Sequence, residues 1–211
     1  MSNAVVQRPS VSSPASRERR AHFIERIKYA RRMQAHFAAN ESALLRLAFD
    51  QCVEETGGPG SDFFDLEYRS MLFEIGIETN TSDRSVNRDV DQAWNLFEHY
   101  RKTARAWRSG DLARRHVEVI IKCGDPIVDD EVRAEYERLV LEYARENTPA
   151  RTESYARRVA AELDPEVIAA RQQRARRERS VRVRDLDDGM SQLVAEIDSA
   201  CAHAIFEALR S

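Results

Sequence analysis

Arginine and asparagine side chains at the start of one expected helix have the types and spacing that can read DNA bases. Arginine can bind guanine, and asparagine can bind adenine, through paired hydrogen bonds in the major groove. The residues with this chemistry are Arg84, Asn87 and Arg88. They follow a polar break at 76–82, and residues 66–97 read as two short helices around a turn, which is typical of a helix-turn-helix. Nearby acids make a solvated helix face the alternative: Asp83, Asp89 and Asp91.

An arginine-rich run near the C-terminus is the second candidate for contacts to nucleic acid. Its one acid is Glu178. A helix with arginine on every face has too little apolar surface to be held by burial, so we expect it to face a polyanion, such as the DNA backbone, or an acidic partner. If about five arginines met phosphates, log affinity would fall against log salt with a slope near −4.5. The run comprises Arg171, Arg174, Arg176, Arg177, Arg179, Arg182 and Arg184.

The alternative for this run is a solvated connector whose arginines pair with carboxylates. Those carboxylates would come from a sister chain or from an earlier helix that carries Glu131, Glu135, Glu137 and Glu142.

Residue types that hold metals or perform catalysis lack the spacing that such sites need. The acids before Gly189 lack the alternating ligands and the closing glutamate of a calcium loop. His116 and Glu118 are two residues apart and so point to different faces of a helix. The sequence has no glycine-rich phosphate loop, nucleophile elbow or helical HExxH motif. We therefore expect no catalytic residue, metal or cofactor in this chain.

The composition predicts a helical protein in the cytoplasm. Of 211 residues, 42% are hydrophobic and 33% are charged, and only 7 Gly and 6 Pro argue against a turn-rich β-sandwich. The net charge of −3 means that any DNA binding must use a local patch. No apolar run is long enough to span a bilayer, and no signal peptide follows the start. Three widely spaced thiols are expected to be buried and reduced: Cys52, Cys123 and Cys201.

Local signals divide the chain into a disordered tail at 1–16, an N-terminal helical part at 17–125 and a C-terminal part at 126–211. Caps and breakers predict most helix ends. The expected signals are Asn40 as a cap, Gly57-Gly58-Pro59-Gly60 as a stop, then Ser61 or Asp62, Ser82, Asp111, Gly124-Asp125-Pro126, Asp129 or Asp130, Thr148-Pro149 and Asp164-Pro165. In the helix after Ser82 we expect an apolar stripe of Val86, Val90, Ala93, Trp94 and Phe97.

The last third of the chain predicts a β-hairpin. Val181 and Val183 alternate with arginines, which is the period-two signal of a strand, and Asp188-Gly189 favours a two-residue turn. A returning strand at 190–195 and a helix after Asp198 should follow. The predicted fold is therefore mainly α, a multi-helix bundle with one small β-hairpin near the C-terminus.

From about residue 37 to the end, the order of these signals resembles an actinobacterial family, the domain of unknown function 222, also called the 13E12 repeat family. The resemblance implies a mostly helical domain attached to an HNH nuclease that cuts DNA with a metal. The matching pieces are Ser82 to Leu96, Trp107-Arg108-Ser109-Gly110-Asp111, Leu163-Asp164-Pro165-Glu166, the arginine run to Arg179, Val181-Arg182-Val183 and Asp188-Gly189-Met190.

The nuclease site itself is not expected in this chain. An HNH site needs a histidine base, a second metal ligand and a positioning asparagine on a ββα fold. The histidines stand singly on predicted helices: His22, His36, His99, His116 and His203. Because the family pattern normally continues past the point where this sequence stops, we expect a fragment or a degenerate copy. The expected function is a non-catalytic, DNA-associated accessory domain of an HNH endonuclease-type protein.

The alternative function is a helical oligomerisation or protein-interaction module with no nucleic-acid role. In that case a partner chain or downstream sequence would cover the apolar residues of the last helix, Ile205, Phe206 and Leu209. The long N-terminal helix, with Phe23 and Ile27, could pair with a second copy, although its broken heptad argues against an extended coiled coil. The expected partners are thus the DNA phosphate backbone, a downstream HNH module or a second copy, and no membrane.

Overall fold

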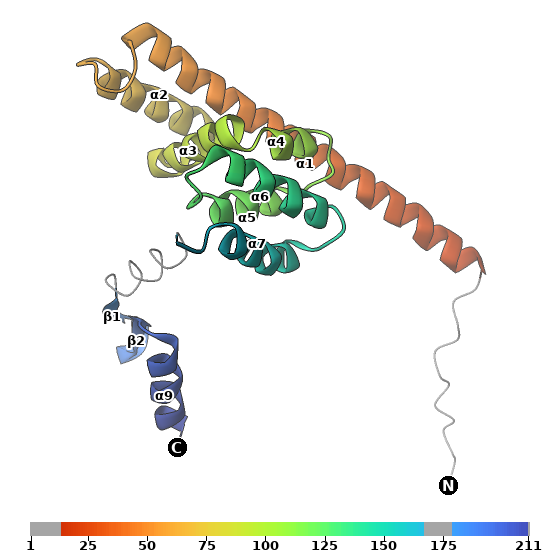
Figure 1. The fold of residues 1–211 in the computed structure, drawn as a ribbon, viewed down its shortest axis with the longest axis vertical. Coiled ribbons are helices and arrows are strands. Elements are labelled where there is room, and N and C mark those ends of the chain that lie inside the picture. The colour runs from red at the N-terminus through yellow and green to blue at the C-terminus, as the bar shows by residue number, and fades with distance from the viewer. Residues whose placement is uncertain (1–13, 167–178, 211) are drawn as a thin grey trace.

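The computed structural model describes residues 14–166 and 179–210. Figure 1 shows a helical body followed by a hairpin and a final helix, so the predicted fold class is confirmed. The helices of the body are α1 (Pro14–Thr56), α2 (Phe64–Thr79), α3 (Asp83–His99), α4 (Arg101–Arg108), α5 (Arg114–Gly124), α6 (Asp130–Ala144) and α7 (Pro149–Leu163). The C-terminal elements are β1 (Ser180–Asp185), the 3-10 turn η1 (Asp187–Gly189), β2 (Ser191–Glu196) and α9 (Ser199–Arg210).

The first helix, α1, is one continuous helix of 43 residues that extends past the other helices (Figure 1). It begins at Pro14, where a proline loses no intrahelical hydrogen bond, so residues 14–16 are helical rather than part of the expected tail. Residues 1–13 lie outside the described part. Asn40 caps no helix, because α1 is continuous through this position; its amide instead contacts His36 Nε2 at 3.0 Å one turn earlier. The glycine-rich stop is confirmed, because α1 ends at Thr56.

The main core lies where α3, α4, α5, α6 and α7 meet, with Ala35 and Ala39 of α1 at its edge. Tyr136 is fully buried and donates its hydroxyl hydrogen to the Ile120 carbonyl at 2.9 Å. A smaller cluster joins α1, α2 and α3 around Leu72, Val86 and Val90. The main core includes residues from both sides of position 125, so α6 and α7 pack with the helices that precede them.

Several predicted helix caps are confirmed. Ser82 Oγ accepts the Ser85 N–H at 3.3 Å, and Asp129 Oδ1 accepts two backbone N–H groups of α6, each at 2.9 Å. Pro149 opens α7 as expected. Neither Ser61 nor Asp62 is the N-cap of α2, which is Phe63, although Ser61 Oγ accepts the N–H of Phe64 at 3.1 Å.

Asp111 was expected to open a helix, and this prediction is wrong. Its N–H bonds back to the Ala106 carbonyl at 2.9 Å, and Gly110 has a φ of 82°, which is the Schellman arrangement that ends a helix. Asp111 therefore belongs to the end of α4, and α5 starts only at Arg114. The break between α3 and α4 at Tyr100 was not predicted.

The hairpin and its turn are confirmed. β1 pairs with β2 antiparallel, from Ser180 opposite Glu196 to Asp185 opposite Ser191. Asp188 and Gly189 both have positive φ, 61° and 72°, and the Met190 N–H bonds the Asp187 carbonyl. α9 starts directly after Asp198, as expected.

The cysteine prediction holds in part, because Cys52 and Cys123 are buried whereas Cys201 on α9 is exposed. Pro165 and Glu166 are helical, at the predicted start of a helix, and residues 167–178 lie outside the described part. Within residues 14–166 and 179–210, no helix has the length and apolarity that crossing a membrane requires.

Candidate functional site

The helix-turn-helix-like segment has a shorter turn than the sequence indicated. Residues 76–79, expected in the break, continue α2, and the turn is limited to 80–82. Asn80 adopts the left-handed conformation with a φ of 52°, and the Thr81 N–H bonds the Gly76 carbonyl at 2.9 Å. Gly76 is required here, because a Cβ at this position would lie 2.8 Å from the Thr81 carbonyl oxygen.

The predicted base-reading residues of α3 do not form a free set. The Asn87 side chain accepts the Tyr68 hydroxyl hydrogen at 2.9 Å and donates to Asp91 at 3.0 Å. Partial burial raises the pKa of Tyr68 to about 12, so its hydroxyl keeps its proton even at pH values at which an exposed tyrosine ionises. Arg88 is exposed and lies 3.3 Å from an Asp89 carboxylate oxygen, whereas Arg84 is exposed and has no ion pair within the described residues.

The described members of the arginine run lie at the hairpin. Arg182 and Arg184 alternate along β1 with Val181 and Val183, so the two arginines share one face of the strand pair. All four side chains are exposed, as is Arg179 just before β1. The remaining members, Arg171, Arg174, Arg176 and Arg177, lie outside the described residues.

The acids proposed as partners of that run have neighbours of their own on α6. Arg138 lies 2.7 Å from Glu135 and 3.8 Å from Glu142. Glu137 is buried and accepts the backbone N–H of Thr103 at 2.8 Å. Glu131 is exposed.

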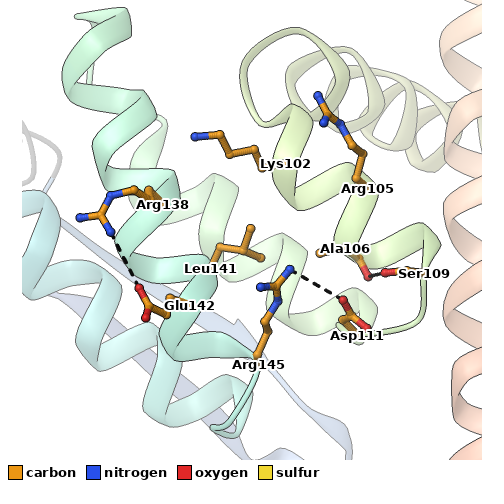
Figure 2. A pocket seen from close by; sticks show the side chains of 9 residues that line it. All are labelled: Lys102, Arg105, Ala106, Ser109, Asp111, Arg138, Leu141, Glu142 and Arg145. Atoms are coloured by element: carbon orange, nitrogen blue, oxygen red, sulfur yellow. Dashed lines mark hydrogen bonds and ion pairs between the residues drawn. The ribbon is translucent and has the colours of Figure 1, made fainter.

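A basic groove that the sequence analysis did not identify runs between α4 and α6 (Figure 2). Its volume is about 610 Å³, and we call it the cationic groove. α4 contributes Lys102 and Arg105, and α6 with the residue after it contributes Arg138 and Arg145. The full lining is Lys102, Arg105, Ala106, Ser109, Asp111, Arg138, Leu141, Glu142 and Arg145.

The charges of the cationic groove are only partly compensated. Arg138 pairs with Glu135 at 2.7 Å and with Glu142 at 3.8 Å, and Arg145 pairs with Asp111 at 3.8 Å. In the part of the chain that is described, no carboxylate lies within ion-pair distance of Lys102 or Arg105. The segment 101–108 carries three arginines and one lysine and no acid. The groove therefore presents local positive charge on an acidic protein.

Tertiary contacts hold α4 in place beside α6. The Thr103 N–H is one of the first four of α4, which lack carbonyl partners inside the helix, and Glu137 of α6 supplies the missing acceptor. The buried side chains of α4, Ala104, Ala106 and Trp107, turn its inner face to the core. The exposed cations on the outer face are positioned by this docking.

The histidines of the body bind backbone and side-chain groups. His36 Nδ1 lies 3.0 Å from the Arg108 carbonyl oxygen, and His116 Nε2 lies 2.8 Å from that of Asn147. His99 Nδ1 is 3.0 Å from an Arg133 nitrogen. His22 and His203 are exposed. Across the described ranges, no three His, Cys, Asp or Glu side chains gather as they would around a metal ion.

Comparison with known proteins gives a family but no characterised relative. The model of the family described as Domain of unknown function (DUF222) matches residues 30–211. No curated protein and no solved structure matches the chain. Because the matched region covers most of the sequence, this chain belongs to the DUF222 family.

Proposed function

We propose that this chain is a non-catalytic, DNA-associated accessory domain of an HNH endonuclease-type protein, as its resemblance to the 13E12 repeat family implies. The observation that carries the proposal is the cationic groove. Lys102 and Arg105 project from an acid-free helix, and neither forms an ion pair within the described residues, although Glu135 is close enough to Lys102 to interact with its charge. Cations without a direct ion pair, on a protein of net charge −3, are the local patch that phosphate binding needs.

The chemistry of the groove suits the DNA backbone better than base edges. Lysine offers a compact charge and arginine a planar fork, and both bind phosphate oxygens. If its four cations each met a phosphate, log affinity would fall against log salt with a slope of about −3.6. Arg84, Arg182 and Arg184 are exposed and could add to this attraction, whereas the amide of Asn87 is already engaged within the protein.

A protein-interaction module without a nucleic-acid role is the second candidate. The observation that favours it is the exposure of apolar side chains at the C-terminal end: Val181, Val183, Leu193, Ile205, Phe206 and Leu209. A two-stranded hairpin is marginally stable by itself, so this segment would gain from a covering partner.

Salt-dependent DNA binding tests the first proposal. Fluorescence anisotropy of a labelled duplex would be measured with the natural protein and with a variant that carries Lys102→Glu and Arg105→Glu. We expect this variant to bind at least roughly tenfold more weakly at low salt, and its slope of log affinity against log salt to be smaller in magnitude by about 2. A control with Arg157→Glu and Arg158→Glu changes the charge equally on the exposed side of α7 and should bind like the natural protein.

Two outcomes would contradict the proposal. One is equal affinity of the groove variant and the control, because the groove would then make no specific contribution. The other is the absence of salt-dependent binding by the natural protein at low salt. Either result, together with concentration-dependent association of the protein, would favour the interaction module.

A further inference from the structure

The N-terminal part of α1 is an exposed helix with both basic and apolar side chains. We call residues 17–32 the α1 arm; every one of its side chains is exposed. It carries seven Lys or Arg residues and two Glu residues. Phe23, Ile24 and Ile27 are each at least half exposed and lie on one side of the helix. The arm continues a packed helix and touches the body at Arg32, which lies beside Gly110, but its apolar side chains are uncovered, so it would gain stability from a partner.

A complementary surface lies on α2, which we call the α2 face. Leu66, Phe73 and Ile77 are more than half exposed, and their spacing of seven and four residues places them on one side of the helix. The opposite side of α2 packs against α1 and α3 through Leu72 and its neighbours. Residues 62–78 carry five acids and one arginine, so the apolar α2 face has an acidic rim.

The arm cannot reach the α2 face of its own chain. α2 lies along the C-terminal half of α1, where the rings of Phe49 and Phe64 are 6.2 Å apart. From Ile27 to Phe49 a straight helix rises by about 33 Å. Figure 1 shows the arm and α2 toward opposite ends of α1. The two surfaces can therefore meet only between two molecules.

We propose that the α1 arm of one copy packs on the α2 face of a second copy, in a two-fold dimer that buries both pairs of surfaces. The two surfaces match in charge, because the basic arm meets an acidic rim. They also match in apolar content and in length, since both helices span about 24 Å. Two α1 helices that run antiparallel about the axis would place each arm beside the partner's α2, which closes the assembly. This inference does not depend on DNA binding by the cationic groove.

Charge reversal and rescue test this dimer. Arg19 and Arg26 are seven residues apart on the arm, and Glu67 and Glu74 are seven residues apart on α2; all four are exposed. We expect the full chain to form a concentration-dependent dimer in analytical ultracentrifugation. Arg19→Glu with Arg26→Glu, or Glu67→Arg with Glu74→Arg, should each raise the dimer Kd at least roughly tenfold. One chain that carries all four changes should dimerise again, because its reversed arm meets a reversed rim.

The rescue separates recognition from a mere loss of folding, and circular dichroism of each variant checks the helix content. The charge-matched variant with Arg157→Glu and Arg158→Glu should dimerise normally. A monomer at every concentration would overturn the proposal, as would failure of the fourfold variant to reassociate. If the protein is monomeric and the variant with Arg19→Glu and Arg26→Glu binds DNA more weakly, the arm is a contact to nucleic acid and not to a second copy. That result would also overturn the proposal.

Discussion

The Glu137 carboxylate of α6 accepts the backbone N–H of Thr103 in α4 at 2.8 Å, in a buried position. The two residues are 34 positions apart in sequence, so a side chain from one helix completes the hydrogen bonding at the start of another. This contact links α4, which carries Lys102 and Arg105, to α6, which carries Arg138. The width of the cationic groove therefore depends on a buried acid that contributes nothing to its lining.

Replacing Glu137 by alanine should destabilise the protein. The Thr103 N–H would lose its acceptor in a buried site, which costs about 1–3 kcal/mol. We expect urea unfolding to show a lower midpoint with little change in slope. Glu137→Gln keeps a carbonyl acceptor and should lose less stability than Glu137→Ala. Equal stability of the alanine variant and the natural protein would mean that this hydrogen bond does not hold α4.

Gly124→Ala should also destabilise the protein, although alanine ordinarily stabilises a helix by about 1 kcal/mol relative to glycine. A Cβ at this position would lie 2.6 Å from the Tyr100 hydroxyl oxygen and would also meet the ring of Tyr136. Both tyrosines are fully buried, so neither ring can move away freely. Overpacking of this kind costs about 1–3 kcal/mol, and thermal unfolding should show it as a lower Tm. Ser70→Ala, on the exposed side of α2, is the control and should change the Tm little.

Much of the fold follows from local signals in the sequence. The Gly57-Gly58-Pro59-Gly60 stop, the Ser82 and Asp129 caps and Pro149 each act within one turn of a helix. The alternation around Val181 and the Asp188-Gly189 turn are equally local and predict the hairpin. Such features are decided by backbone conformation and by hydrogen bonds to near neighbours, which a single sequence contains.

The features that the sequence analysis missed depend on distant residues. The break at Tyr100 has no glycine or proline, and the acceptor that stabilises the start of α4 comes from Glu137. Asn87 looked free for DNA because its partner Tyr68 lies on another helix. The cationic groove needs α4 and α6 to meet, although four cations without an acid in 101–108 were a signal in the sequence itself.

Asn87→Ala should lower stability without lowering DNA affinity. The Tyr68 hydroxyl would lose its acceptor, at a cost of about 1 kcal/mol, while the variant loses no positive charge. Urea unfolding and anisotropy on one protein preparation would separate the two effects. A clear loss of affinity for duplexes that contain adenine, with unchanged affinity for others, would restore base reading by α3.

Stability should begin to fall above pH 10 because of the buried tyrosines. Burial raises the pKa of Tyr68 to about 12, and it raises the pKa of Tyr100 and Tyr136 as well. The unfolded chain loses these protons near pH 10, before the folded protein does. The stabilisation is therefore complete below pH 10 and, for Tyr68, is lost as the pH rises to about 12. Chemical unfolding from pH 8 to 12 should show this decline, and Tyr68→Phe should make it shallower. If the Tyr68→Phe variant lost stability as steeply as the natural protein, the decline would not come from Tyr68.

Neutralising the arginine run should weaken DNA binding to the same extent for all sequences. Arginines that contact phosphates attract every duplex alike, because the backbone carries the charge and the bases carry the information. Replacing Arg174, Arg176, Arg177 and Arg179 together by glutamine should reduce the magnitude of the log–log salt slope by about 3.6 if all four meet phosphates. Gel-shift titrations with two unrelated duplexes at several salt concentrations measure both quantities. Unchanged affinity would mean that the arginine run does not contact DNA. In that case the cationic groove would be the DNA-binding surface, and the variant with Lys102→Glu and Arg105→Glu should bind DNA more weakly.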